Sequence, residues 1–277
     1  MTAPARTPRP GPPAEARVAV KICGVTDPAS ALLSAELGAD YLGLNFWPGS
    51  PRCLDLPRAR EIAAAVRAAA PRVALVGVFV HPAAAAVREA AEAVGLDLLQ
   101  FSGDETPEDV RPFAGCAIKA LRREQESQAA AVAAFADCWG LLLDAPAGAG
   151  ASGARGAAAG GRAPAASPMA GAGAAPLYGG TGRQWDYAAA AAVISGAGPG
   201  AAGSADAAAS PGLPAARRRV FLAGGLRPAN VRRVVAALRP FAVDVCSGVE
   251  SAPGRKDPRL LRQLFEEVRN GQAPVAT

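Results

Sequence analysis

The residues of this chain that can carry chemistry follow short apolar segments. Cys23 follows the run 18–22, Asp144 follows 140–143, Gly224 and Gly225 follow 220–223, and Ser247 and Gly248 come just after 241–245. A thiol and a carboxyl group that share one site can act as general base and general acid. The thiol must then have a lowered pKa, helped by Lys21 or by loop amides, and burial must raise the pKa of the carboxyl group. Taken singly, Cys23 also fits a buried small residue and Asp144 a turn cap.

The glycines indicate a phosphate site. Glycine lets the backbone approach a ligand closely and leaves N–H groups free to point at it, although a glycine pair can also mark a simple tight turn. A short helix after the eighth apolar run would add its positive N-terminal end. The predicted phosphate-binding residues are Gly224, Gly225, Ser247 and Gly248, with Gly180, Thr181 and Gly182 closing a third side.

Arg52 is the candidate for binding a second anionic group. It lies in the segment Ser50-Pro51-Arg52, and its planar guanidinium can bind a carboxylate through two parallel hydrogen bonds. The alternative interpretation is a surface arginine. Cys246 lies near the predicted phosphate loop, and we expect it to fill space.

Strands and helices alternate along the chain. The predicted strands are 18–22, 41–46, 73–80, 96–101, 117–121, 140–143, 220–223 and 241–245. The predicted helices are 27–37, 56–69, 82–94, 106–113, 124–136, 186–194, 228–238 and 258–270. Strict alternation predicts a parallel sheet, and eight repeats predict closure into a (β/α)8 TIM barrel of the α/β class. The candidate residues then share the C-terminal rim, where the active sites of such barrels lie.

The predicted organisation is a single domain. We expect a barrel over 17–270, a disordered tail over 1–16 and a second disordered tail over 271–277. Two insertions rich in Ala, Gly and Pro, 147–176 and 196–216, interrupt the barrel. Their composition cannot bury enough apolar surface to offset the entropy of ordering, so we expect both to be disordered.

Composition disfavours several function classes. The formal charge of +5 is spread along the chain, whereas a nucleic-acid-binding protein would present a basic face with aromatic side chains. An anionic small-molecule substrate fits the charge better. No apolar run reaches the length of a membrane span, and residues 1–16 lack the apolar core typical of a signal peptide, so we expect none there. Five cysteines without a CxxC pair, beside one histidine, disfavour a zinc site and indicate a reducing compartment, so we expect a cytoplasmic protein without a metal.

The motifs occur in the order known for one enzyme family. They are Lys21-Ile22-Cys23-Gly24, Ser50-Pro51-Arg52, Gly103-Asp104-Glu105, Asp144, Gly179-Gly180-Thr181-Gly182, Ala223-Gly224-Gly225-Leu226, Ser247-Gly248-Val249-Glu250 and Lys256-Asp257. Together they resemble the phosphoribosylanthranilate isomerase family of tryptophan biosynthesis, over residues 17–269 without the insertions. The chain departs from the family pattern at Ser102, where a histidine is common.

The resemblance implies an Amadori rearrangement of N-(5-phosphoribosyl)anthranilate to 1-(2-carboxyphenylamino)-1-deoxyribulose 5-phosphate. It assigns Asp144 as the general acid, Cys23 as the general base and Arg52 as the ligand of the anthranilate carboxylate. The glycine loops and Ser247 would hold the phosphate, without a metal or an organic cofactor. Family members occur as monomers and as dimers, and we expect a monomer.

Two alternatives remain open. One is another phosphosugar barrel enzyme, such as an indole-glycerol-phosphate synthase or the aldose–ketose isomerase of histidine biosynthesis. The other is a barrel that binds phosphorylated metabolites without catalysis. The Cys23 and Asp144 pair argues against both.

Overall fold

The computed structural model describes residues 17–122, 128–144, 187–195 and 219–273. The predicted N-terminal tail and the predicted insertions at 147–176 and 196–216 lie outside these residues, as do Gly180, Thr181 and Gly182.

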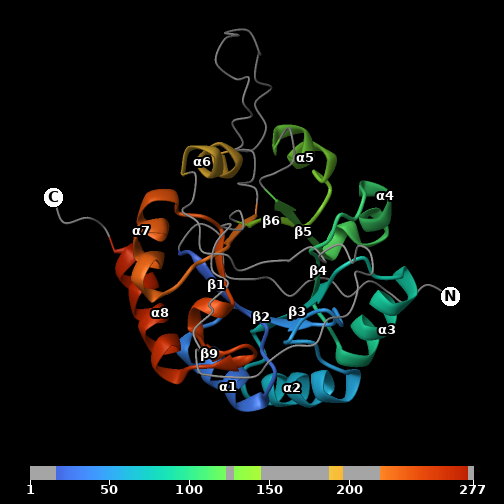
Figure 1. The fold of residues 1–277 in the computed structure, drawn as a ribbon, viewed down its shortest axis with the longest axis horizontal. Helices are drawn as coiled ribbons and strands as arrows, with labels where there is room; N and C mark the ends of the chain where they lie inside the picture. The colour runs from blue at the N-terminus through green and yellow to red at the C-terminus, as the bar shows by residue number, and fades with distance from the viewer. Residues whose placement is uncertain (1–16, 123–127, 145–186, 196–218, 274–277) are drawn as a thin grey trace, which may run out of the picture.

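Eight parallel strands form a closed barrel in chain order, with β8 paired to β1 (Figure 1). The strands are β1 Ala19–Cys23, β2 Tyr41–Asn45, β3 Ala74–Phe79, β4 Leu98–Phe101, β5 Ala117–Arg122, β6 Gly140–Asp144, β7 Val220–Ala223 and β8 Ala242–Val245. The predicted (β/α)8 TIM barrel is thereby confirmed. Every predicted strand overlaps an observed one, because parallel strands buried on both faces are nearly continuous apolar runs.

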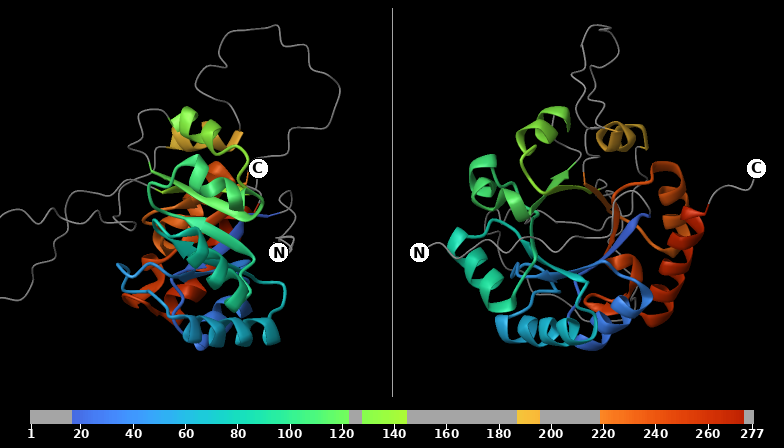
Figure 2. Two further views of the ribbon diagram at one scale, coloured as in Figure 1. Left: turned by 90° about the vertical axis from the view of Figure 1, so that its right-hand side faces the viewer. Right: turned by 180° about the vertical axis from the view of Figure 1, so that it is seen from behind.

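The helices lie outside the strands and form a ring around them (Figures 1 and 2). They are α1 Pro28–Leu37, α2 Leu56–Ala69, α3 Ala84–Val94, α4 Pro107–Val110, α5 Gln128–Ala134, α6 Tyr187–Ser195, α7 Pro228–Leu238 and α8 Pro258–Gln272. At the start of two helices an aspartate accepts a hydrogen bond from a backbone amide, Asp27 from Ser30 at 2.8 Å and Asp257 from Arg259 at 2.7 Å. These side chains satisfy N–H groups that have no partner inside the helix.

The helix predicted over 106–113 is shorter in the structure. After the four residues of α4 the chain continues as a 3-10 helix, Arg111–Cys116. Pro112 has no N–H and its ring disfavours the preceding α-helical turn, so an α-helix cannot continue through it.

The C-terminal boundary also differs from the prediction. Residues 271 and 272 belong to α8, not to a tail. Gly271 is buried, and Gln272 accepts a hydrogen bond from the Val18 amide at 3.0 Å. The helix extends this far because its last turn packs against α7 and the start of β1, which the local pattern does not reveal.

Two apolar layers divide the core. One fills the barrel and includes Ala19, Tyr41, Phe221 and Ala242, and the other lies between the strands and the helices. Side chains alternate between the two layers because successive residues of a strand point to opposite faces. The polar residues of the inner layer therefore stand out as candidates for function.

An antiparallel hairpin of β9 Glu250–Ala252 and β10 Arg255–Lys256 follows β8. The sequence did not predict it. The 3-10 helix Ser247–Val249 precedes the hairpin where a short helix was expected.

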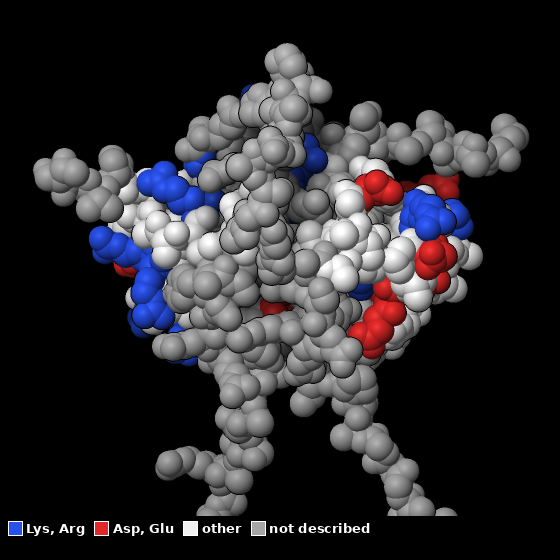
Figure 3. Space-filling model, turned by 90° about the horizontal axis from the view of Figure 1, so that it is seen from above, with Lys and Arg blue, Asp and Glu red and all other residues white. Residues whose placement is uncertain are grey.

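The described helices include none that is both long and apolar enough to cross a membrane. On the face in Figure 3, described Lys and Arg side chains lie mainly toward α7 and α8, and acidic ones mainly toward α3 and α4. The described part of this face therefore carries both signs of charge.

Candidate active site

The inward-facing residues of β1 and β8 form matched pairs. Ala19 lies opposite Ala242, and Lys21 lies opposite Asp244. The Lys21 Nζ donates a hydrogen bond to Asp244 Oδ2 at 2.9 Å, with both side chains buried. Since every second residue of a strand points to the same face, the next inward pair at the C-terminal end is Cys23 and Cys246.

Cys23 lies in an electropositive environment at the end of β1. The pKa of its thiol is lowered well below the usual value, first by a hydrogen bond with Cys246 and then by the positive charges of Lys21 and Lys256, against the opposing effect of burial. Gly43 makes room for this thiol, because a Cβ at that position would lie 2.7 Å from the Cys23 sulfur. The predicted lowering of the thiol pKa therefore has a structural cause.

The partner Cys246 does more than fill space. Its thiol is hydrogen-bonded with that of Cys23, and this bond and burial raise the pKa of Cys246 well above its usual value. The expectation from the sequence was wrong here, because only barrel closure places the end of β8 beside the end of β1.

Lys256 joins the hairpin to the ends of both strands. Its buried Nζ donates hydrogen bonds to the backbone carbonyl oxygens of Cys23 and Cys246 and to Glu250 Oε1 at 2.8 Å. Sequence reasoning gave this lysine no role. Its signal was a charged residue within a motif, but the motif did not reveal what the side chain contacts.

Asp144 lies partly exposed at the C-terminal end of β6. The structure places it near Asp244, whose pKa is raised to about 7 by burial and further by the negative charges of Cys23 and Asp144, while Lys21 lowers it. The negative charges of both predicted proton-transfer residues thus act on the buried carboxyl group of Asp244. Cys23 is the last residue of β1 and Asp144 is the last residue of β6, so both lie at the same mouth of the barrel, as predicted.

Asp244 and Lys21 form a buried charged pair beneath this mouth. Burial alone would lower the pKa of Lys21, but Asp244 and then Cys23 raise it above its usual value, so the lysine stays charged. Asp244 Oδ1 has no hydrogen-bond partner among the described residues. Sequence reasoning missed Asp244, although a charge in the middle of a buried strand was a usable signal.

Arg52 also lies at the mouth, but its guanidinium already has a partner. Its Nε donates to Glu250 Oε1 at 2.8 Å, and its side chain is 18% exposed. Gly24, with φ +68°, permits the close approach of the arginine, because a Cβ there would overlap the Arg52 side chain. The position agrees with a ligand-binding role, while the ion pair with Glu250 was not foreseen.

The predicted phosphate loops lie against each other. A Cβ on Gly248 would overlap the carbonyl oxygen of Leu226, so the loop after β8 touches the loop after β7. Gly224 and Gly225 have φ of +92° and +62°, which residues with a Cβ adopt only with strain. The Asn230 amide donates to the Gly225 carbonyl at 2.9 Å and holds the turn.

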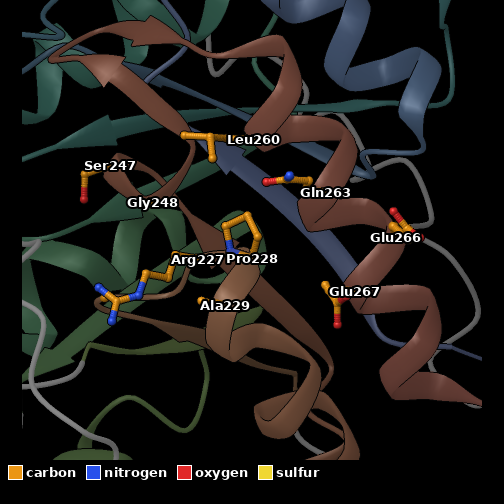
Figure 4. A pocket seen from close by; sticks show the side chains of 10 residues that line it. Arg227, Pro228, Ala229, Ser247, Gly248, Leu260, Gln263, Glu266 and Glu267 are labelled. Atoms are coloured by element: carbon orange, nitrogen blue, oxygen red, sulfur yellow. The ribbon is translucent and has the colours of Figure 1, made fainter.

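A pocket of about 1010 Å³ opens beside these loops (Figure 4). Ser247, Gly248 and Arg227 lie at one end, whereas Glu266 and Glu267 lie at the other. Gly225 lines the pocket too, whereas Gly224 does not. An anion would therefore be favoured at the end that holds the loop residues, since the carboxylates repel it from the other end.

The rim after β4 holds a further buried ion pair. Lys119 Nζ donates to Glu105 Oε2 and to the Gly103 carbonyl, each at 2.7 Å. Ser102, which departs from the family pattern, accepts a hydrogen bond from the Gln100 amide at 2.9 Å. This loop is therefore held by a charged pair of which the sequence motif includes Glu105 but not Lys119.

Within the described ranges, no group of three or more His, Cys, Asp and Glu side chains is arranged to hold a metal ion.

A family model described as N-(5'-phosphoribosyl)anthranilate isomerase matches residues 20–156 and 196–267. The relative from Myxococcus xanthus with this name is 41% identical over 256 residues, covering 91% of this chain and 97% of its own length. The one from Acidithiobacillus ferrooxidans is 37% identical over 254 residues, covering 91% and 98%.

Solved structures agree with these sequence matches. The phosphoribosyl anthranilate isomerase of Thermotoga maritima superposes with a TM-score of 0.67 at 29% identity, covering 91% of this chain and 98% of its own. A structure of such an isomerase in complex with reduced 1-(o-carboxyphenylamino)-1-deoxyribulose 5-phosphate has a TM-score of 0.65 at 28% identity, with the same coverage. The chain belongs to the N-(5'-phosphoribosyl)anthranilate isomerase family.

Proposed function

We propose that Cys23 and Asp144 carry the proton transfers of the reaction that this chain catalyses in tryptophan biosynthesis. That reaction is the Amadori rearrangement of N-(5-phosphoribosyl)anthranilate to 1-(2-carboxyphenylamino)-1-deoxyribulose 5-phosphate. Asp144 protonates the furanose ring oxygen, and ring opening leaves a Schiff base. Cys23 then removes the proton from C2′, and the resulting enolamine tautomerises to the ketone.

The observation that carries this proposal is the environment of Cys23. A thiol must be deprotonated to accept a proton, and the pKa of Cys23 is lowered by Cys246, Lys21 and Lys256. These three groups therefore favour the thiolate before substrate binds.

Asp144 is supported by its place at the mouth. It lies close enough to Asp244 to raise the pKa of that group, as Cys23 also does. A second negative charge nearby favours the protonated form of a carboxyl group. The two carboxyl groups therefore interact at the barrel mouth, where the proposed general acid is needed.

For substrate binding we propose two anion sites. Arg52 binds the anthranilate carboxylate with the donors that Glu250 leaves available. Gly224, Gly225, Ser247 and Gly248 bind the phosphate through backbone N–H groups and the serine hydroxyl. Gly180, Thr181 and Gly182 complete this site in the proposal, on the strength of their sequence alone.

Further proposals rest on composition and charge. We propose that the enzyme is a cytoplasmic monomer that needs neither a metal nor an organic cofactor and binds neither nucleic acid nor a membrane. We also propose that 147–176 and 196–216 are insertions within one domain and that 1–16 is a tail. Removal of 147–176 is expected to leave cooperative unfolding intact.

The test of the catalytic residues is a fluorescence assay with freshly generated substrate. We expect Cys23→Ala and Asp144→Asn each to lower kcat about 10²- to 10⁴-fold, because each removes one proton-transfer group. Cys138→Ala removes a partly buried thiol that lies before β6 and is the matched control. Substrate binding should persist in all variants. An unchanged kcat in folded Cys23→Ala would rule out the base, and the same result for Asp144→Asn would rule out the acid.

A further inference from the structure

The proposed active site contains a second thiol that exchanges no proton with the substrate in the proposed reaction. Cys246 directly follows β8, and Cys23 is the last residue of β1. The two residues are neighbours on the inner face of the barrel. The preceding pairs of these two strands, Ala19 with Ala242 and Lys21 with Asp244, are in direct register. Neighbouring strands lie about 4.8 Å apart, which falls within the Cα separations of disulfides.

The contacts of Lys256 hold the two cysteines together. This lysine donates hydrogen bonds to both of their carbonyl oxygens, with the Cys246 oxygen at 3.1 Å, and its Nζ lies 3.9 Å from the Cys246 sulfur. Gly24, directly after Cys23, leaves the space beside the pair open, since a Cβ there would lie 3.0 Å from the Cys246 sulfur. The two thiols are also hydrogen-bonded to each other, so they are in direct contact.

The two thiols are chemically unequal. The pKa of Cys23 is lowered and that of Cys246 is raised, each first by the hydrogen bond to the other. A thiolate is the form that attacks peroxide, and a nearby thiol is what resolves the product. Cys23 is 9% exposed and Cys246 is partly exposed, so oxidation of this pair requires a reagent as small as hydrogen peroxide.

We propose that Cys23 and Cys246 are a peroxide-oxidised thiol pair that closes to a disulfide and reversibly stops catalysis. The Cys23 thiolate attacks one oxygen of hydrogen peroxide. The O–O bond breaks, a sulfenic acid forms, and the leaving hydroxide takes a proton to become water. Cys246 then attacks the Cys23 sulfur, the S–O bond breaks, and hydroxide leaves with the thiol proton as a second water. Overall, two thiols are oxidised by two electrons while one peroxide is reduced to two waters.

The pair has a consequence for the enzyme. A thiolate without a partner continues to sulfinic acid, which is irreversible in most proteins, whereas a disulfide is reduced by thiols. Cys246 therefore protects Cys23 while removing it from the reaction. The loss of activity rests on the proposed role of Cys23 as base, but formation of the bond does not.

The test treats the full-length chain with hydrogen peroxide, blocks free thiols with N-ethylmaleimide, and maps the peptides by mass spectrometry. We expect a cross-linked peptide pair that contains Cys23 and Cys246, and a loss of activity of about tenfold or more. Dithiothreitol should remove the cross-link and restore the activity. If the cross-link forms while activity persists, the inhibitory part of the proposal and the role of Cys23 as base both fail.

Two variants sharpen the result. In Cys246→Ser we expect no cross-link, sulfinic acid on Cys23, and activity that dithiothreitol does not restore. Cys138→Ser, the matched control, should behave as the parent chain does. Sulfinic acid on Cys23 of the parent chain without a cross-link would overturn the proposal, and so would pairing of Cys23 with another cysteine or the absence of oxidation at Cys23.

Discussion

At the residue scale, the chemistry of Cys23 depends on opposing influences on one thiol. Burial in a low-dielectric site disfavours a thiolate, while a hydrogen bond from Cys246 and the charges of Lys21 and Lys256 favour it. The favourable contacts prevail, so the pKa falls. Lys256 is notable among them because it also holds the strand ends on which both cysteines lie.

Replacing Lys256 with Met should raise the pKa of Cys23, because one of the charges that stabilise the thiolate is lost. A group with a higher pKa loses its proton only at higher pH, so the rate of Cys23 alkylation by iodoacetamide should rise at higher pH than in the parent chain. Once the pKa lies above the pH, each further unit of increase lowers the thiolate fraction about tenfold. The rate is measured against pH by mass spectrometry.

Arg255→Met is the matched control, since Arg255 is an exposed cation one residue away. It should leave the alkylation curve in place. Cys246→Ala, which removes the hydrogen-bonding thiol, should shift the curve in the same direction as Lys256→Met does. An unmoved curve in both of these variants, if they are folded, would show that neither contact lowers the pKa of Cys23.

At the scale of elements, the loops after β7 and β8 depend on each other. Gly248 allows the 3-10 helix Ser247–Val249 to touch the Leu226 carbonyl. The proposed phosphate site requires this contact, because its N–H groups come from both loops. A side chain at this point must push the loops apart.

We expect Gly248→Ala to raise KM for the phosphorylated substrate more than it lowers kcat. The added Cβ displaces the phosphate loops but lies away from the Cys23 thiol. Gly115→Ala is the control, because a Cβ there meets nothing within 4 Å. Steady-state kinetics of both variants provides the measurement. Equal KM values would show that Gly248 does not shape the substrate site.

The ion pair of Lys119 and Glu105 links β5 to the loop after β4. Both side chains are buried, and Glu105 Oε1 also accepts hydrogen bonds from the amides of His81 and Gly103. Burial alone would raise the pKa of Glu105, but Lys119 and then the His81 amide lower it below its usual value. The charged carboxylate therefore stabilises the folded state.

Glu105→Gln should lower the free energy of unfolding by about 3–5 kcal/mol at neutral pH, because Lys119 is left buried without its counterion. The contribution of a carboxylate with a lowered pKa is present above its unfolded pKa and is lost as pH falls through its folded pKa. The difference between variant and parent should therefore shrink in acid. Denaturant titrations at several pH values measure it.

The exposed pair of Glu108 and Arg111, 3.3 Å apart, offers the comparison. Glu108→Gln should change the free energy of unfolding by less than about 1 kcal/mol, since water screens exposed ion pairs. Equal effects of the two substitutions would refute the importance of burial for the Lys119 and Glu105 pair.

At the scale of the whole molecule, the first and last segments of the described barrel contact and stabilise each other. β8 pairs with β1, and Gln272 at the end of α8 bonds to both backbone groups of Val18. The contact joins residues 254 positions apart in the chain. The last turn of α8 therefore supports the residue that precedes β1, the strand that ends at Cys23.

Gln272→Ala should lower the free energy of unfolding by about 1 kcal/mol, the usual net contribution of a hydrogen bond, because the Val18 groups lose their partner. Asn270→Ala removes an exposed amide from the same helix and should have little effect. Thermal and denaturant unfolding compare the two. If Gln272→Ala matched the parent chain, the stabilising role of this contact would be refuted.

The sequence alone determined the barrel and the rim on which the candidate residues lie. The alternation of strands and helices is a local pattern of the sequence. In a parallel barrel, the C-terminal ends of all strands lie on the same side. The placement of Cys23, Asp144 and the two glycine loops at strand ends therefore followed from the chain itself. The motifs further identified the family.

Only the tertiary structure decided which of these residues touch. The contact of Cys23 with Cys246, the charge of Lys256 beside them and the pairing of Arg52 with Glu250 all join segments far apart in the chain. Local pattern cannot reveal such contacts, because they depend on barrel closure and on the register between β1 and β8. The pKa of Cys23 follows from these contacts, since a thiol responds to charges within a few ångströms wherever they lie in the sequence.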